Sequence, residues 1–123
     1  MDAARKAELK AAYKERRPRA GVFQVVNRKN GKVLVRASMD IDALMTRTRF
    51  GLAMGGDMFH DTLQKEWKEF GAEAFSFEVL ELLEKMETKT DIEIKGELED
   101  LEKKYLRELQ PYGDRGYNRK PIM

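Results

Sequence analysis

The sequence predicts a small α+β domain in which helices flank a three-stranded antiparallel sheet. Two β-branched runs, GVFQVVN and KVLVRAS, flank an Asn30-Gly31 pair, and this pattern is a strong local indication of a β-hairpin. A third extended run, AFSFEVLEL, follows two segments with helical spacing. A chain of 123 residues with 41% apolar content can close one hydrophobic core. The expected order is helix, strand, strand, helix, helix, strand, helix.

The first segment, residues 1–20, is expected to be a peripheral helix. Ala3 to Arg17 mixes helix-forming and charged residues, and Pro18 disfavours helix in the residue before it. After the hairpin, Asp40 can cap a helix that the Gly55-Gly56 pair ends. Its apolar positions roughly follow the helical period at Ile41, Leu44, Met45 and Leu52.

The next helix is expected from Asp61 to Phe70, with Leu63, Trp67 and Phe70 on its apolar stripe and Gly71 after its end. We expect Trp67 to lie in the core.

The third strand and the last helix complete the domain. Phe75, Phe77 and Val79 alternate with polar residues, as in a half-buried strand. Thr90 or Asp91 can cap a long helix that ends before Pro111. Its apolar stripe comprises Ile94, Leu98, Leu101, Tyr105 and Leu109, and residues 119–123 form a tail.

Composition excludes several classes of site. The chain has no cysteine, which excludes disulfide scaffolds, zinc fingers and thiol catalysis. Only oxygen ligands and the single histidine, His60, remain for a metal, so a hard cation such as Mg²⁺ is the expected kind. No apolar run has the length of a membrane span or the form of a secretory signal, and we expect a cytoplasmic protein without membrane contact.

Charge is separated along the chain although the net charge is only +2. Residues 1–52 carry 13 Lys/Arg and 5 Asp/Glu, which gives +8, whereas residues 53–110 carry 8 and 16, which gives −8. A basic half can face the phosphates of a nucleic acid. It can equally be a solvated surface, and composition alone does not choose between the two.

The strands and their loop also resemble a known family. GVF and LVR, joined by an N-x-x-N-G-K loop, are similar to the paired motifs of the GIY-YIG endonuclease domain. The resemblance continues through LQKEWKEFGAEAFSFEVLE, ELEDLEKKYLREL and the closing GYN, and it spans residues 21–118. It implies a GIY-YIG-like domain over that range.

The resemblance also identifies the positions of a nuclease site. Phe23 and Leu34 stand where the family has its two tyrosines, and Leu44 stands where it has a phosphate-binding arginine. Glu102 matches the glutamate that holds a divalent cation, and Asn118 matches a supporting asparagine. A phenyl ring and an alkyl chain cannot transfer protons, so we expect most catalysis to be lost. One retained carboxylate would hold Mg²⁺ only weakly.

Three functions remain open at this stage. The first is a catalytically impaired domain associated with nucleic acid, with DNA as the expected partner. The second is a metal-dependent endonuclease that uses relocated residues, with Arg47, Tyr112, Tyr117 or His60 as candidates. The third is a remnant that binds another protein or a second copy. In the first case the backbone would be contacted by Arg28, Lys29, Lys32, Arg36, Arg47 and Arg49.

Arg36 stands where the family has a glycine and shares a strand face with Leu34. We hypothesise that it pairs with Glu102 and fills the space that a metal and a phosphate would use. The alternative is that Arg36 is a cation that protects an edge strand from aggregation.

Overall fold

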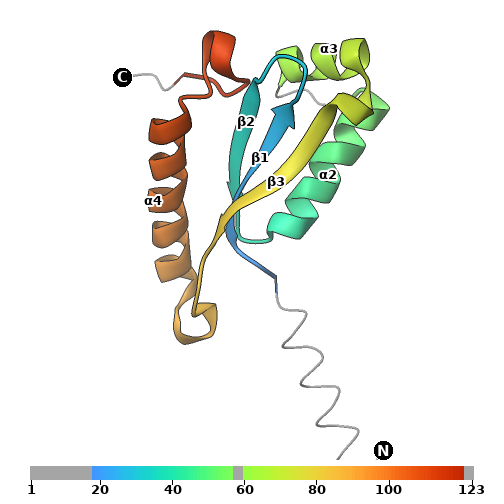
Figure 1. The fold of residues 1–123 in the computed structure, drawn as a ribbon. Helices are drawn as coiled ribbons and strands as arrows, with labels where there is room; N and C mark the ends of the chain where they lie inside the picture. Colours follow the sequence, from blue (N-terminus) through green and yellow to red (C-terminus); the bar gives the residue numbers. More distant parts are fainter. Residues whose placement is uncertain (1–17, 57–59, 121–123) are drawn as a thin grey trace, which may run out of the picture.

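The structure is a computed structural model that describes residues 18–56 and 60–120. The helix expected within residues 3–17 lies outside the described residues. The other predicted elements are present in the predicted order (Figure 1). Their bounds are β1 Gly21–Asn27, β2 Val33–Ser38, α2 Ile41–Met54, α3 Asp61–Phe70, β3 Phe75–Leu82 and α4 Asp91–Leu109, with short 3-10 turns at Ala72–Ala74, Met86–Thr88 and Gly113–Arg115.

The three strands form one antiparallel sheet in the order β2-β1-β3, which confirms the predicted α+β class. In the β1–β2 hairpin Phe23 lies opposite Arg36, and Val25 lies opposite Leu34. The turn between the strands closes with a 2.7 Å hydrogen bond from the Gly31 amide to the Asn27 carbonyl. Gly31 has a φ of +80°, a conformation that glycine adopts without steric cost.

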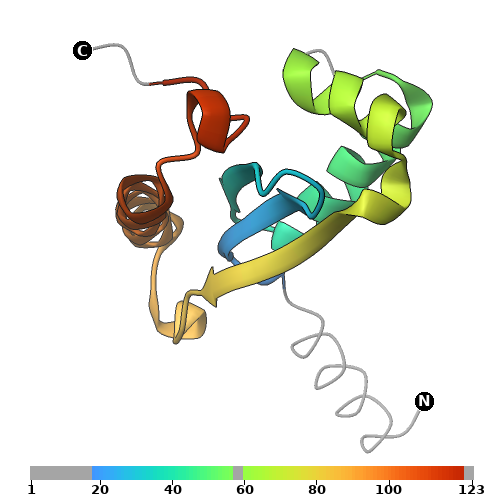
Figure 2. The ribbon, with the colours of Figure 1, turned by 45° about the horizontal axis from the view of Figure 1, so that its top comes forward.

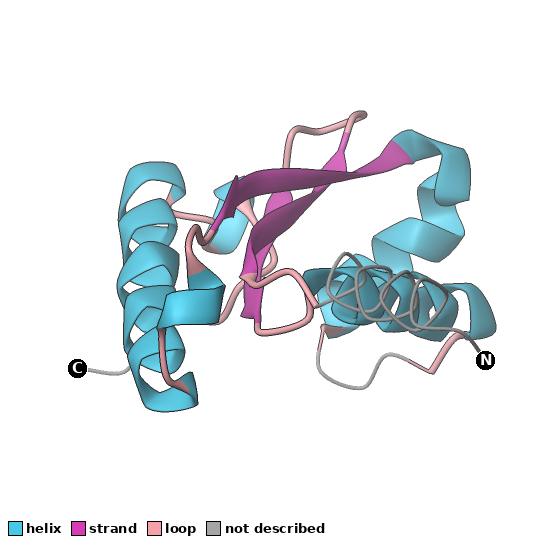
Figure 3. Cartoon of the chain, turned by 90° about the horizontal axis from the view of Figure 1, so that it is seen from below, coloured by secondary structure: helices cyan, strands magenta, loops and turns pink. Residues whose placement is uncertain are grey.

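Each face of the sheet is covered by different helices, because neighbouring strand residues point to opposite sides. Phe23 and Leu34 pack with α2 and α3 in the larger apolar cluster. Val22 and Val35 pack with Leu101 of α4 in the smaller one. Figures 2 and 3 show α4 on one side of the sheet and α2 on the other. Any contact between the two sets of helices must therefore pass around an edge of the sheet.

Helix ends follow the predicted capping pattern. The carboxylate of Asp40 accepts a 3.1 Å hydrogen bond from the Ala43 amide at the start of α2. Gly55 ends that helix with a φ of +75°. Thr90 rather than Asp91 caps α4, since its hydroxyl accepts from the Glu93 amide at 3.2 Å.

β3 forms one edge of the sheet and carries an irregularity. Phe23 pairs with Val79, but its neighbour Val22 pairs with Glu81, so Leu80 is an extra residue in β3.

The Trp67 ring lies 5.0 Å from the ring of Phe75, between centroids, and only 8% of Trp67 is exposed. The prediction that Trp67 belongs to the core is confirmed.

No helix within residues 18–56 and 60–120 has the length and apolar character needed to cross a bilayer.

Candidate functional site

Phe23 and Leu34 are core residues. The first is fully buried and the second is 1% exposed. The ring of Phe23 stacks on that of Phe77 with 6.4 Å between centroids and 17° between the ring planes. Both side chains consist of carbon and hydrogen alone, so neither can accept a proton or hold a water molecule. At these two positions the molecule has packing in place of acid–base chemistry.

The side chain of Leu44 is half-buried and packs against the same apolar cluster. One turn later on α2, the buried hydroxyl of Thr48 donates a 2.7 Å hydrogen bond to the Leu44 carbonyl. The same hydroxyl accepts a 3.3 Å hydrogen bond from Nη1 of Arg36. The guanidinium of Arg36 is thus directed toward α2.

This placement corrects the Arg36–Glu102 hypothesis. Arg36 lies on the sheet face that α2 covers, whereas Glu102 belongs to α4, which packs on the opposite face. The sequence placed both residues in one site, but strand alternation directs Arg36 away from α4. The proposed ion pair is therefore wrong. The alternative, a cation that protects an edge strand, stays a prediction; β2 does lie at the edge of the sheet.

Asn118 binds the outer edge of β2. Its Oδ1 accepts a 2.8 Å hydrogen bond from the Val35 amide, and its Nδ2 donates at 2.8 Å to the Val35 carbonyl. Next to it, the Tyr117 amide donates to the Val33 carbonyl at 2.9 Å. A Cβ on Gly116 would lie 2.4 Å from the backbone of Pro111, so only glycine fits there. The C-terminal segment thereby pairs with an otherwise open strand edge.

Glu102 lines a hollow of about 400 Å³ between the end of β2 and α4. Glu99, Lys95 and Ser38 share it. Within the part of the chain that the structure describes, no three His, Asp or Glu side chains come together as metal ligands would. Two carboxylates beside a lysine do not form the ligand set that holds Mg²⁺ firmly.

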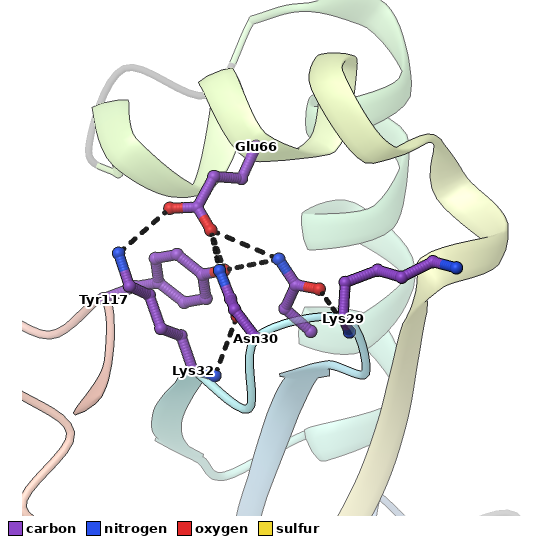
Figure 4. A network of polar contacts seen from close by, with 6 residues as sticks. Lys29, Asn30, Lys32, Glu66 and Tyr117 are labelled. Atoms are coloured by element: carbon purple, nitrogen blue, oxygen red, sulfur yellow. Dashed lines mark hydrogen bonds and ion pairs between the residues drawn. The ribbon is translucent and has the colours of Figure 1, made fainter. Parts of the chain in front are cut away.

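A buried polar network that no sequence motif indicates is centred on Glu66 of α3 (Figure 4). Only 8% of Glu66 is exposed. Its Oε1 accepts hydrogen bonds from the Tyr117 hydroxyl at 2.9 Å and from Nδ2 of Asn27 at 3.2 Å, and also from Nδ2 of Asn30. Its Oε2 forms a 3.3 Å ion pair with Nζ of Lys32. The network joins the hairpin turn, α3 and the C-terminal segment.

The network determines which of its members can titrate. Burial raises the pKa of the Glu66 carboxyl, but hydrogen bonds from Asn30 and Tyr117 and the Lys32 cation outweigh it, and the pKa falls below its ordinary value. Burial and the neighbouring carboxylate raise the pKa of the Tyr117 phenol. Tyr117 therefore stays protonated and bonded to Glu66, which makes it a poor substitute for a catalytic tyrosine.

One sequence feature could have revealed Glu66. It follows Leu63 by three positions and precedes Trp67, so helical geometry places it beside the buried stripe of α3. A carboxylate at such a position requires partners.

The six predicted nucleic-acid-binding cations have different surroundings. Lys32 forms an ion pair with Glu66, and the guanidinium of Arg28 donates a hydrogen bond to the Glu73 carbonyl. The guanidinium carbon of Arg49 lies 4.5 Å from the centroid of the Phe77 ring. The remaining three are Arg36 near Thr48 and the exposed residues Arg47 and Lys29.

His60 occupies the position before α3, but its side chain does not cap the helix.

Comparison with solved structures identifies the fold. The catalytic domain of the homing endonuclease I-TevI superimposes with a TM-score of 0.64 and 24% sequence identity, over 83% of this chain and 99% of that one. A mutant of the same catalytic domain gives a TM-score of 0.64 and 23% identity, over 81% and 92%. The chain has a GIY-YIG-like fold. No protein-family model matches it, and no curated protein matches it by sequence.

The GIY-YIG-like fold explains why nonpolar residues occupy the motif positions without disturbing the sheet. Phe23 and Leu34 are inward-facing members of the β1–β2 hairpin, where any large apolar side chain completes the core.

Proposed function

We propose that this chain is a nucleic-acid-binding domain that retains a GIY-YIG-like scaffold and hydrolyses phosphodiesters very slowly or not at all. The observation that carries the proposal is the complete burial of Phe23 and Leu34 in the core. Neither side chain has an oxygen atom, so neither can transfer a proton at these two strand positions. The I-TevI fold supports nucleic acid, with DNA as the first candidate, as the partner.

The expected loss of rate is large. A positioned acid–base group contributes about 10²–10⁴-fold, and an electrostatic contact to developing charge contributes about 10²–10³-fold. Leu44 removes the second kind of contact from α2, and the buried Tyr117 phenol does not replace the first. Binding does not depend on these groups, because it requires only cations that face the backbone.

The cations best placed for binding are Arg36 and Arg47. Arg36 is held by Thr48, and Arg47 is the neighbouring exposed residue on α2. Arg36 belongs to β2, whose outer edge Asn118 covers, and the exposed Arg119 follows Asn118 in the chain. α4, on the opposite side of the sheet, is rich in acidic residues and would repel a phosphate backbone.

The test measures cleavage and binding together. Labelled duplex DNA is incubated with the protein with and without Mg²⁺ or Mn²⁺, and binding is followed by fluorescence anisotropy across salt concentrations. We expect no cleavage and an affinity that falls steeply with salt. Arg47→Gln should reduce the slope of log affinity against log salt by about one, and Lys103→Gln on α4 should not.

Two results would contradict the proposal. Metal-dependent cleavage that disappears in Glu102→Ala would favour an active nuclease with relocated residues. Absence of salt-sensitive binding to any nucleic acid would favour a protein-interaction domain.

A further inference from the structure

A groove runs between α2 and β3, on the flank of α2 that faces away from Arg36. It has a volume of about 640 Å³ and is lined mainly by Met45, Arg49 and Phe50 of α2 and by Phe77 of β3. Arg47 and Arg49 lie two positions apart, which separates them by about 200° around the helix axis. The groove is thus a different surface from the edge of β2.

Two aromatic rings and one cation meet in this groove. Phe50 is 65% exposed, so its ring is available to a partner. The guanidinium of Arg49 lies over the ring of Phe77, 4.5 Å from its centroid, and both residues line the groove. Val79 follows Phe77 by two positions on β3 and is 41% exposed, so it extends the apolar surface along the strand.

The charge of the groove is positive. Among the residues that the structure describes, Asp42 is the one acidic residue lining the groove, and Arg19 pairs with it through a 2.6 Å contact from Nη2 to Oδ1. The opposite charges of Arg19 and Asp42 cancel, so Arg49 determines the net charge of the groove. A partner must therefore offer a flat apolar surface and a negative charge close together.

We propose that this groove binds an unpaired base of a single-stranded nucleic acid, with the base stacked on Phe50 and the adjoining phosphate on Arg49. Stacking on an aromatic side chain next to a cation is how proteins bind single strands without reading sequence. In a duplex the bases are stacked on one another and their faces are not available. The inference rests on the proposed function and extends it to a class of ligand.

The experiment compares two exposed phenylalanines. A labelled 12-nucleotide oligothymidine and a duplex of the same length are titrated with the full chain and with Phe50→Ala. Phe50→Ala should weaken single-strand binding by about 5- to 100-fold and duplex binding much less. Phe50→Trp should retain the affinity. Phe70→Ala is the matched control, since Phe70 is 37% exposed but lies at the end of α3 outside the groove.

The outcomes separate the two proposals. If the wild-type chain binds neither probe, the proposed function fails and this inference fails with it. If the wild type binds but Phe50→Ala and Phe70→Ala behave alike, only this inference is overturned. It is also overturned if Phe50→Ala changes the sedimentation mass without changing single-strand affinity, because the groove then holds a second copy.

Discussion

The hydroxyl of Tyr117 donates a 2.9 Å hydrogen bond to the carboxylate of Glu66, 51 positions earlier in the chain. Nδ2 of Asn27, in the hairpin, lies within hydrogen-bond distance of both, at 3.1 Å from the phenol and 3.2 Å from the carboxylate. These three residues connect the C-terminal segment to α3 and to the hairpin. Because Asn118 follows Tyr117, the network also sets the position of the residue that covers the edge of β2.

Tyr117→Phe should lower the free energy of unfolding by about 1–3 kcal/mol. The substitution keeps the ring in the core but removes one donor from a buried carboxylate and one acceptor from Asn27. Urea denaturation followed by fluorescence of Trp67, the single tryptophan, measures the change. Tyr112→Phe is the control and should stay within about 0.5 kcal/mol of wild type. Equal stability of the two variants would mean that the network contributes nothing.

The fold was predictable from local chemistry. The Asn30-Gly31 turn, the Asp40 cap and the Gly55 end of α2 each depend on a few neighbouring residues, and the structure confirms them. Contacts between distant segments were not predictable in this way. Glu66 finds its donors in the hairpin and near the C-terminus, and no periodicity links those segments.

The candidate site was predictable in composition but not in placement. The resemblance assigned Phe23, Leu34 and Glu102 to one site, and the sequence could not show that α4 covers the opposite face from the first two. The extra residue in β3 has a similar origin. Leu80 looks like a regular member of an apolar run, and only pairing with β1 reveals the shift.

Glu66 should make the stability depend on acidic pH. Its folded-state pKa lies below the ordinary value of 4.5, so its carboxylate stabilises the fold above that pH, and the contribution is lost as pH falls through the lower folded-state pKa. Glu66→Gln should cost about 1–3 kcal/mol at pH 7 and reduce the loss between neutral and acidic pH. Urea denaturation over that range measures both. Glu69→Gln, exposed on the same helix, is the control; a steeper acid loss in Glu66→Gln than in wild type would contradict the assignment.

Asn118→Ala should expose the outer edge of β2. The variant removes the side chain that accepts from the Val35 amide and donates to the Val35 carbonyl, each at 2.8 Å. Hydrogen exchange at the Val35 amide should accelerate, because its acceptor is lost. Amides inside the β1–β2 ladder provide the internal reference and should change far less. Unchanged exchange at Val35 would show that water replaces Asn118 without loss of protection.

Phe23→Tyr tests whether the first motif position can regain its chemistry by one change. The Phe23 ring is fully buried against Phe77, so a phenolic oxygen added there enters an apolar cluster. Burying a hydroxyl without a partner costs about 1–3 kcal/mol, and we expect the urea midpoint to fall accordingly. DNA cleavage should remain absent, because Leu34 and Leu44 still lack polar groups. Phe77→Tyr, on the half-buried neighbouring ring, is the matched control and should cost less, since water can reach its edge. Cleavage by Phe23→Tyr at unchanged stability would mean that the position opens to solvent and that the domain is one substitution away from nuclease activity.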